Sequence, residues 1–401
     1  MEHQHAPRPV IAGIVAALVG FTSSFAVVLA GLRAVGADPA EAASGLLVLS
    51  FTQGVGILWL TLRHRTPLIL AWSTPGAAML ATTGAVAGGW PAAVGAFLLV
   101  GGLIVLSGLV PALGRLISAI PTPLAQAMLA GVVLSLCLAP VRGLASEPWL
   151  VAPILVGWLL ATRFIPRWAV PIAFAITLLV IGVAAWGDLG RAAVTPALAW
   201  TSPTLTWPAV FGLALPLFVV TMASQNVPGA AVISSYGYPV PWRESMTVTG
   251  IGTLAGATFG GHAVNLAAIT ASMTANPDVH PDPRRRWVAA HAAGWTYLVL
   301  GLLSAPLTAY VTLAPADVIG TVAGLALLGT LAAALHGALA GPQRREGVII
   351  CFVVAASGTV IGGIGAAFWA LLAGLAVQAL LSRRLGEGSS PTTGTNQQST
   401  R

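Results

Sequence analysis

Only a few polar side chains lie deep inside the long apolar stretches of this 401-residue sequence, and they are the candidates for chemistry. They are Thr22, Ser23, Ser24, Gln53, Ser73, Thr74, Gln225, Asn226, His262 and Asn265. Burying an unpaired amide in hydrocarbon costs about 2–7 kcal/mol, so Gln225 and Asn226 are expected to face a partner or a ligand. His262 is the one titratable side chain among them. It either binds a proton or acts as a neutral hydrogen-bond partner.

Two apolar segments are interrupted at matching places. They read LILAWSTPGAAML at 68–80 and GGHAVNLAAITASM at 260–273. Each predicts a short extended piece followed by a half-helix: Ser73 or Thr74 caps the first, with Pro75 in its first turn, and Asn265 caps the second. Two helix N-termini that face each other near the middle of a membrane would suit a carboxylate. The alternative is that Pro and Gly simply kink two packed helices.

The elements that position these residues must be membrane helices. Hydrophobic residues make up 57% of the sequence, charged residues 7%, and the mean hydropathy is +0.89, which excludes a soluble domain of this length. The apolar windows predict about 14 spans, some short or broken, with natural breaks at 84–90 and 359–365. Backbone groups in hydrocarbon must bond internally, so the predicted fold is an all-α polytopic membrane protein.

The net charge of +7 comes from 18 basic residues, all arginine, which lie in short loops and not in a nucleic-acid-binding cluster. With a cytoplasmic N-terminus, only Arg33, Arg142 and Arg191 fall outside, as the positive-inside rule requires. We therefore expect a multi-pass protein of the cytoplasmic (inner) membrane with both termini cytoplasmic. The first span should be uncleaved, and the polar tail 386–401 should be disordered. Cys137 and Cys351 lie in apolar windows and predict no disulfide.

The sequence divides near residue 200 into halves of seven predicted spans each. An odd number per half gives the halves opposite orientations, which is the arrangement of inverted-repeat transporters. Residues 121–136 weakly resemble residues 314–331, although Ala-Gly pairs in so apolar a chain also coincide by chance. The expected architecture is a 7+7 inverted repeat in which spans 3 and 10 are half extended and half helical.

Two strings carry a family resemblance: LPLFVVTMASQNVPG at 215–229 and GGHAVNLAAITA at 260–271. They resemble the BenE-type benzoate:proton symporters, and the likeness extends over about residues 9–382. The resemblance implies a fold similar to the uracil and nucleobase transporters, with the extended pieces of spans 3 and 10 paired as antiparallel strands. It also implies a core of 1–116 (spans 1–4) and 201–312 (spans 8–11), and a gate of 117–200 (spans 5–7) and 313–385 (spans 12–14).

The resemblance further implies import of benzoate or a related aromatic carboxylate by proton symport, with alternating access as the core moves against the gate. His262 would bind the coupled proton. The predicted substrate-binding residues are Phe25, Trp72, Ser73, Thr74, Pro75, Gly76, Gln225, Asn226, Asn265, Leu266 and Ala267. The nucleobase carriers have acidic residues where Gln225 and Asn265 stand, and their loss makes sense if the ligand is itself an anion.

Other functions stay open at this point. A nucleobase carrier, a carrier of another organic anion, or an anion channel would share the fold. A membrane-embedded enzyme would need a nucleophile with a base, or several metal ligands at one depth, and the sequence shows neither. We expect no cofactor, metal or nucleic-acid partner. Membrane lipid surrounds the chain, and the resemblance suggests a homodimer, with the monomer as the alternative.

Overall fold

Helices make up most of the computed structural model, which describes residues 8–110, 121–184, 195–340 and 345–386. The first half holds α1 (Arg8–Ala34), α2 (Pro39–His64), β1 (Leu70–Trp72), α3 (Thr74–Thr83), α4 (Gly89–Leu109), α6 (Thr122–Cys137), α7 (Ala139–Ser146), α8 (Pro148–Phe164), the 3-10 turn η1 (Pro166–Trp168) and α9 (Ala169–Ala184). The predictions for the tail 387–401, for Arg191 and for the 116/117 boundary lie outside the described residues.

The second half begins with a long helical stretch, Trp207–Ser235, that contains two π-helical turns. This half holds α10 (Trp207–Ala209), the π-helical turn η3 (Val210–Ala214), α11 (Leu215–Thr221), the π-helical turn η4 (Met222–Asn226), α12 (Val227–Ser235), α13 (Trp242–Ala257), β2 (Val264–Leu266), α14 (Ile269–Ala275), the 3-10 turn η5 (Pro283–Arg285), α15 (Trp287–Leu302), α16 (Ser304–Val311), α17 (Ala316–Leu339), α18 (Arg345–Ala356) and α19 (Ala366–Gly386).

Seven helical stretches among the described residues are long and apolar enough to cross a membrane. They are α1, α2, α4, Thr122–Ser146, Pro166–Ala184, Trp207–Ser235 and α17. The pair Pro283–Leu302 and Ser304–Val311, bent by 52°, makes an eighth. This agrees with a multi-pass membrane protein. Two shorter apolar helices, Pro148–Phe164 and Ala366–Leu381, are also described, and the count of fourteen stays a prediction.

The chain leaves the helical conformation at both predicted break points. In each break, three glycines adopt a positive φ, which residues with a Cβ rarely do. These glycines are Gly84, Gly88, Gly89, Gly358, Gly362 and Gly363. The break between α18 and α19 also contains a bridge between Ile361 and Ile364. Both interruptions are therefore confirmed.

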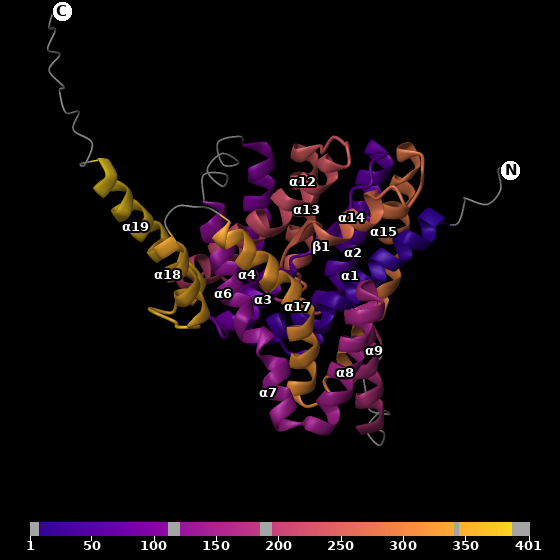
Figure 1. The fold of residues 1–401 in the computed structure, drawn as a ribbon, viewed down its shortest axis with the longest axis horizontal. Coiled ribbons are helices and arrows are strands. Elements are labelled where there is room, and N and C mark those ends of the chain that lie inside the picture. Colours follow the sequence, from indigo (N-terminus) through magenta and orange to yellow (C-terminus); the bar gives the residue numbers. More distant parts are fainter. Residues whose placement is uncertain (1–7, 111–120, 185–194, 341–344, 387–401) are drawn as a thin grey trace, which may run out of the picture.

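Helices approach closely where small residues meet, as is common in membranes. A Cβ built on Gly31 of α1 would lie 2.4 Å from the Ala77 carbonyl oxygen of α3, and one on Gly131 of α6 would lie 2.5 Å from the Phe352 oxygen of α18. One group of packed helices contains α1, α2, α4, α13 and α15, and another contains α6, α17, α18 and α19. Figure 1 shows β1 near the centre of the molecule, with α7 at the lower end.

Candidate anion-binding site

The two broken segments meet as a short antiparallel strand pair. Leu70 of β1 pairs with Leu266 of β2, and Trp72 pairs with Val264. The pairing extends beyond the strands, because the Ser73 N–H donates to the Ala263 carbonyl at 2.9 Å and the Ala267 N–H donates to the Ile69 carbonyl at 3.0 Å. The predicted strand pair is confirmed, and it brings the two halves of the chain together at one point.

Helix α3 starts directly at this crossing. Ser73 is its N-cap, and its hydroxyl accepts from the Gly76 N–H at 3.2 Å and shares a 2.8 Å hydrogen bond with the Thr221 hydroxyl. The Thr74 hydroxyl donates to Ser24 at 2.8 Å. Pro75 has no N–H. Among the described residues, the Thr74 N–H is therefore the first-turn donor that has no acceptor, and it is left for a ligand.

The prediction that Asn265 caps the second half-helix is wrong. Asn265 lies inside β2, whereas α14 begins at Ile269 with Ala268 as an N-cap that makes no side-chain hydrogen bond. With its amide oriented by the surrounding hydrogen-bond pattern, Asn265 donates to the Leu266 carbonyl at 2.8 Å and accepts from the Ser73 N–H at 3.1 Å. The extended backbone continues past Asn265, so its side chain ties the strands together.

Gln225 and Asn226 lie in the π-helical turn η4, a distortion frequent at functional sites. Asn226 is fully buried; its oxygen accepts from the Leu266 N–H at 2.8 Å and its nitrogen lies 3.1 Å from the sulfur of Met222. The Gln225 amide is half-buried and has no hydrogen-bond partner among the described residues. The two adjacent amides therefore differ: Asn226 holds β2, and Gln225 is free for a ligand.

A row of aromatic rings runs beside the crossing. Trp72 lies 5.4 Å from Phe21, Phe21 lies 5.5 Å from Phe25, and Phe25 meets Phe174 of α9 edge-on at 5.6 Å, all between ring centroids. The sequence predicts Phe25 and Trp72 as site residues but not Phe21 and Phe174. Phe21 stands one helical turn before Phe25, and that spacing was the available signal.

His262 is completely buried beside the start of α3. Its Nε2 lies 3.0 Å from the Ser73 carbonyl oxygen, and its ring packs edge-on against Phe97 at 6.4 Å between centroids. A carbonyl only accepts, so Nε2 carries the proton of this bond. Nδ1 has no partner among the described residues. His262 thus supports the crossing and keeps one ring nitrogen unused.

Most of the predicted binding residues are buried in this conformation, and only Thr74 and Gln225 are half-buried. The acidic residues that the structure describes all lie at helix starts or in loops, as Asp38, Glu244 and Asp317 illustrate. No described carboxylate therefore offsets the positive potential of the α3 N-terminus. Such a site suits an anion with an apolar body.

A bundle of apolar helices in which two broken segments cross near a neutral, donor-bearing site is the architecture of a membrane transporter. The chain belongs to the BenE family, described as benzoate membrane transport protein, whose family model matches residues 3–380. The "Inner membrane protein YdcO" of Escherichia coli (strain K12) is 38% identical over 371 residues, covering 92% of this chain and 94% of that protein. The "Benzoate membrane transport protein" of Acinetobacter baylyi is 28% identical over 376 residues, covering 91% and 93%.

Solved anion-transporter structures share the fold at low sequence identity. The transmembrane domain of the cyanobacterial bicarbonate transporter BicA gives a TM-score of 0.60 at 16% identity, covering 94% of this chain and 98% of that one. SLC26A9 gives 0.62 at 14% identity, covering 94% of this chain and 66% of that chain. These likenesses concern the fold alone. The relation to the uracil transporters stays a prediction.

Proposed function

We propose that the protein imports benzoate or a close aromatic carboxylate together with protons. The observation that carries the proposal is the half-buried Gln225 amide, which has no partner among the described residues and lies four residues after Thr221, whose hydroxyl is bonded to the Ser73 N-cap of α3. The family description and the name of the Acinetobacter relative support benzoate as the substrate.

In the proposed complex, the carboxylate accepts hydrogen bonds from Gln225 and the Thr74 N–H, and the ring lies against Phe25 and Trp72. Phe25 is 0% and Trp72 2% exposed, so the ligand requires the aromatic row to open. The contact between Phe25 of α1 and Phe174 of α9 is the place to open, because these helices belong to the proposed core and gate. Hydrogen bonds to an ionised carboxylate are about twice as strong as neutral ones, so this geometry favours the anion.

The proposed transport cycle moves the core (1–116 and 201–312) against the gate (117–200 and 313–385) in a 7+7 inverted repeat of fourteen spans. The opposite strand directions at the crossing fit such a repeat. The termini are proposed to be cytoplasmic. His262 is the proposed proton carrier, because its Nδ1 is unpaired and its Nε2 touches the backbone at the α3 cap. His262→Gln should then retain benzoate binding but lose the acceleration of uptake by a proton gradient.

The test is uptake of radiolabelled benzoate into proteoliposomes under an inward proton gradient, with salicylate, uracil and bicarbonate as competitors. We expect saturable, gradient-driven uptake that salicylate blocks and uracil does not. Gln225→Ala should raise the KM for benzoate, whereas Gly102→Ala is the control, since a Cβ there meets nothing within 4 Å. Block by uracil would support a nucleobase carrier, and unsaturable current without proton coupling would support a channel. Absence of uptake by protein shown to be folded would exclude benzoate as the substrate.

A further inference from the structure

A separate cavity lies between the proposed core and gate. Its volume is about 390 Å³, within the range of roughly 300–1,000 Å³ that small-molecule sites occupy. Val15 of α1 and Met273 of α14 supply apolar lining, and Trp168 of η1, 36% exposed, supplies an aromatic ring. None of the strand-crossing residues lines the cavity, and six residues of α1 separate Val15 from Phe21, the ring that contacts Trp72, a rise of about 9 Å. The cavity is therefore distinct from the strand crossing.

Two arginines from different elements line this cavity. Arg8 is the first described residue of α1, and Arg167 lies in η1, immediately before α9. Both side chains are exposed and lack a partner among the described residues. Asp278, also in the lining, is the one acidic side chain there. Two guanidinium groups against one carboxylate leave the lining with a net positive charge.

The positions of both arginines follow the positive-inside rule, and helix α9, which begins two residues after Arg167, adds to the charge of the cavity. A helix N-terminus carries the positive end of the helix dipole. Helix α9 has no acidic residue in its first turn to offset this potential. The N-terminus of α9 adds to the positive potential of the arginines, and a cleft of one sign concentrates ions of the other sign.

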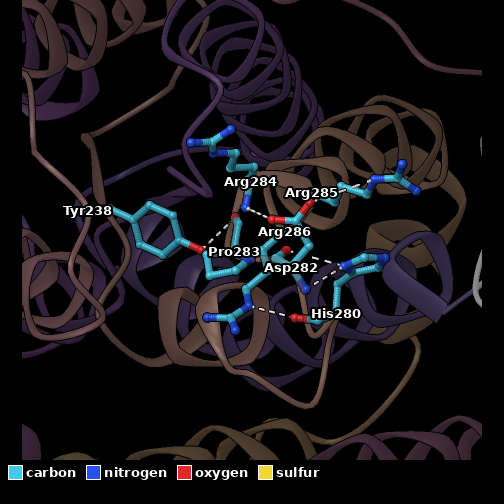
Figure 2. A network of polar contacts seen from close by, with 7 residues as sticks. All are labelled: Tyr238, His280, Asp282, Pro283, Arg284, Arg285 and Arg286. Carbon is cyan, nitrogen blue, oxygen red and sulfur yellow. Dashed lines mark hydrogen bonds and ion pairs between the residues drawn. The ribbon is translucent and has the colours of Figure 1, made fainter.

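One wall of the cavity is held firmly in place. Asp278 and Val279 belong to the connection between α14 and α15, which Figure 2 shows from His280 onwards. The buried Arg286 donates to the His280 carbonyl at 2.8 Å and to the Ala275 carbonyl at 3.2 Å. The Tyr238 hydroxyl donates to the Pro283 carbonyl at 2.8 Å. The wall is thus ordered without any contribution from Arg8 or Arg167, which stay available to a ligand.

We propose that this cavity is a second site for aromatic carboxylates, in which Arg8 and Arg167 bind the carboxylate and Trp168 contacts the ring. We call it the outer site because it lies between the strand crossing and the face where α1 begins. The proposal rests on the proposed function for its choice of ligand. The anion would occupy the outer site on its way between the strand crossing and the face where α1 begins. Arg8 comes from the proposed core and Arg167 from the gate, so movement of one against the other would change how both hold the anion.

The test is photolabelling of the purified full chain with 4-azidobenzoate, with the labelled residues mapped by mass spectrometry. We expect labels on the cavity lining that excess benzoate prevents and that higher salt reduces. The double variant Arg8→Gln with Arg167→Gln should lower this labelling about tenfold, because electrostatic focusing raises the local concentration of an anion by about tenfold or more. Labelling at the strand crossing should continue. Arg163→Gln is the matched control, because Arg163 is exposed near the ring of Phe164 and does not line the cavity.

The lysine variants Arg8→Lys with Arg167→Lys keep the charge and should retain most of the labelling, so a folding defect in the glutamine variants is recognised. Labelling does not require transport. A wild type that labels in the cavity but takes up no benzoate would refute the import function and leave the outer site standing. Absence of benzoate-protected labels from the cavity, or equal labelling in the double glutamine variant and Arg163→Gln, would overturn the outer site.

Discussion

Replacing Gln225 and Asn226 separately by alanine should produce opposite defects, although the two amides are adjacent in the chain. Asn226→Ala removes the acceptor of the buried Leu266 N–H, a 2.8 Å bond. Leaving such a donor unpaired costs about 1–3 kcal/mol, so the free energy of unfolding should fall by about 2 kcal/mol. Gln225→Ala removes an amide without a partner among the described residues, so its stability should change by less than about 0.5 kcal/mol.

The affinities should follow the reverse order. A hydrogen bond to a charged group contributes about 1.5–3 kcal/mol, so Gln225→Ala should weaken benzoate binding by roughly ten- to hundredfold. The assays are thermal unfolding of the purified protein in detergent and equilibrium binding of radiolabelled benzoate, each at a temperature where both variants are folded. If Gln225→Ala destabilises the protein as much as Asn226→Ala does and binds benzoate normally, the assigned roles of the two amides are refuted.

Three further variants test the surrounding packing and loops. Gly31→Ala should cost about 1–3 kcal/mol of stability in thermal unfolding, because its Cβ would lie 2.4 Å from the Ala77 oxygen and neither backbone can yield, whereas Gly102→Ala should be neutral. Arg286→Met should make the chain after α14 more susceptible to proteolysis, since two carbonyls lose their donor; wild-type cleavage rates would contradict this. Burial raises the pKa of Tyr238 in the folded protein, and although Arg286 opposes this effect the net direction is upwards. Its stabilisation is therefore present below the unfolded pKa of about 10 and is lost as pH rises through the folded value, so Tyr238→Phe should weaken the alkaline loss of stability measured by unfolding against pH.

The parts of the site that the sequence could predict are those set by local backbone chemistry. Ser73 before Pro75 is a strong N-cap signal, and the structure has Ser73 capping α3. The glycine-rich breaks were equally predictable, because residues with a Cβ rarely adopt a positive φ. The strand pair followed from the resemblance, since three-residue strands carry too little pattern to be identified from their residues alone.

The parts that failed or were missed depend on tertiary contacts. Asn265 has the residue type of an N-cap, but the extended backbone continues because Leu266 pairs with Leu70 and its N–H is satisfied by Asn226. The π-helical turn that contains both Gln225 and Asn226 has no signature in residue composition. Phe174 reaches the site only because α9 packs against α1.

The decisive measurement for the substrate site is a structure of the protein with 4-iodobenzoate bound, in which the iodine atom marks the ring and the ring fixes the position of the carboxylate. The proposed complex predicts the carboxylate within hydrogen-bond distance of the Gln225 amide and the Thr74 N–H, with the iodinated ring against Phe25 and Trp72. A ligand bound only elsewhere, with Gln225 left uncontacted, would contradict the site at the strand crossing.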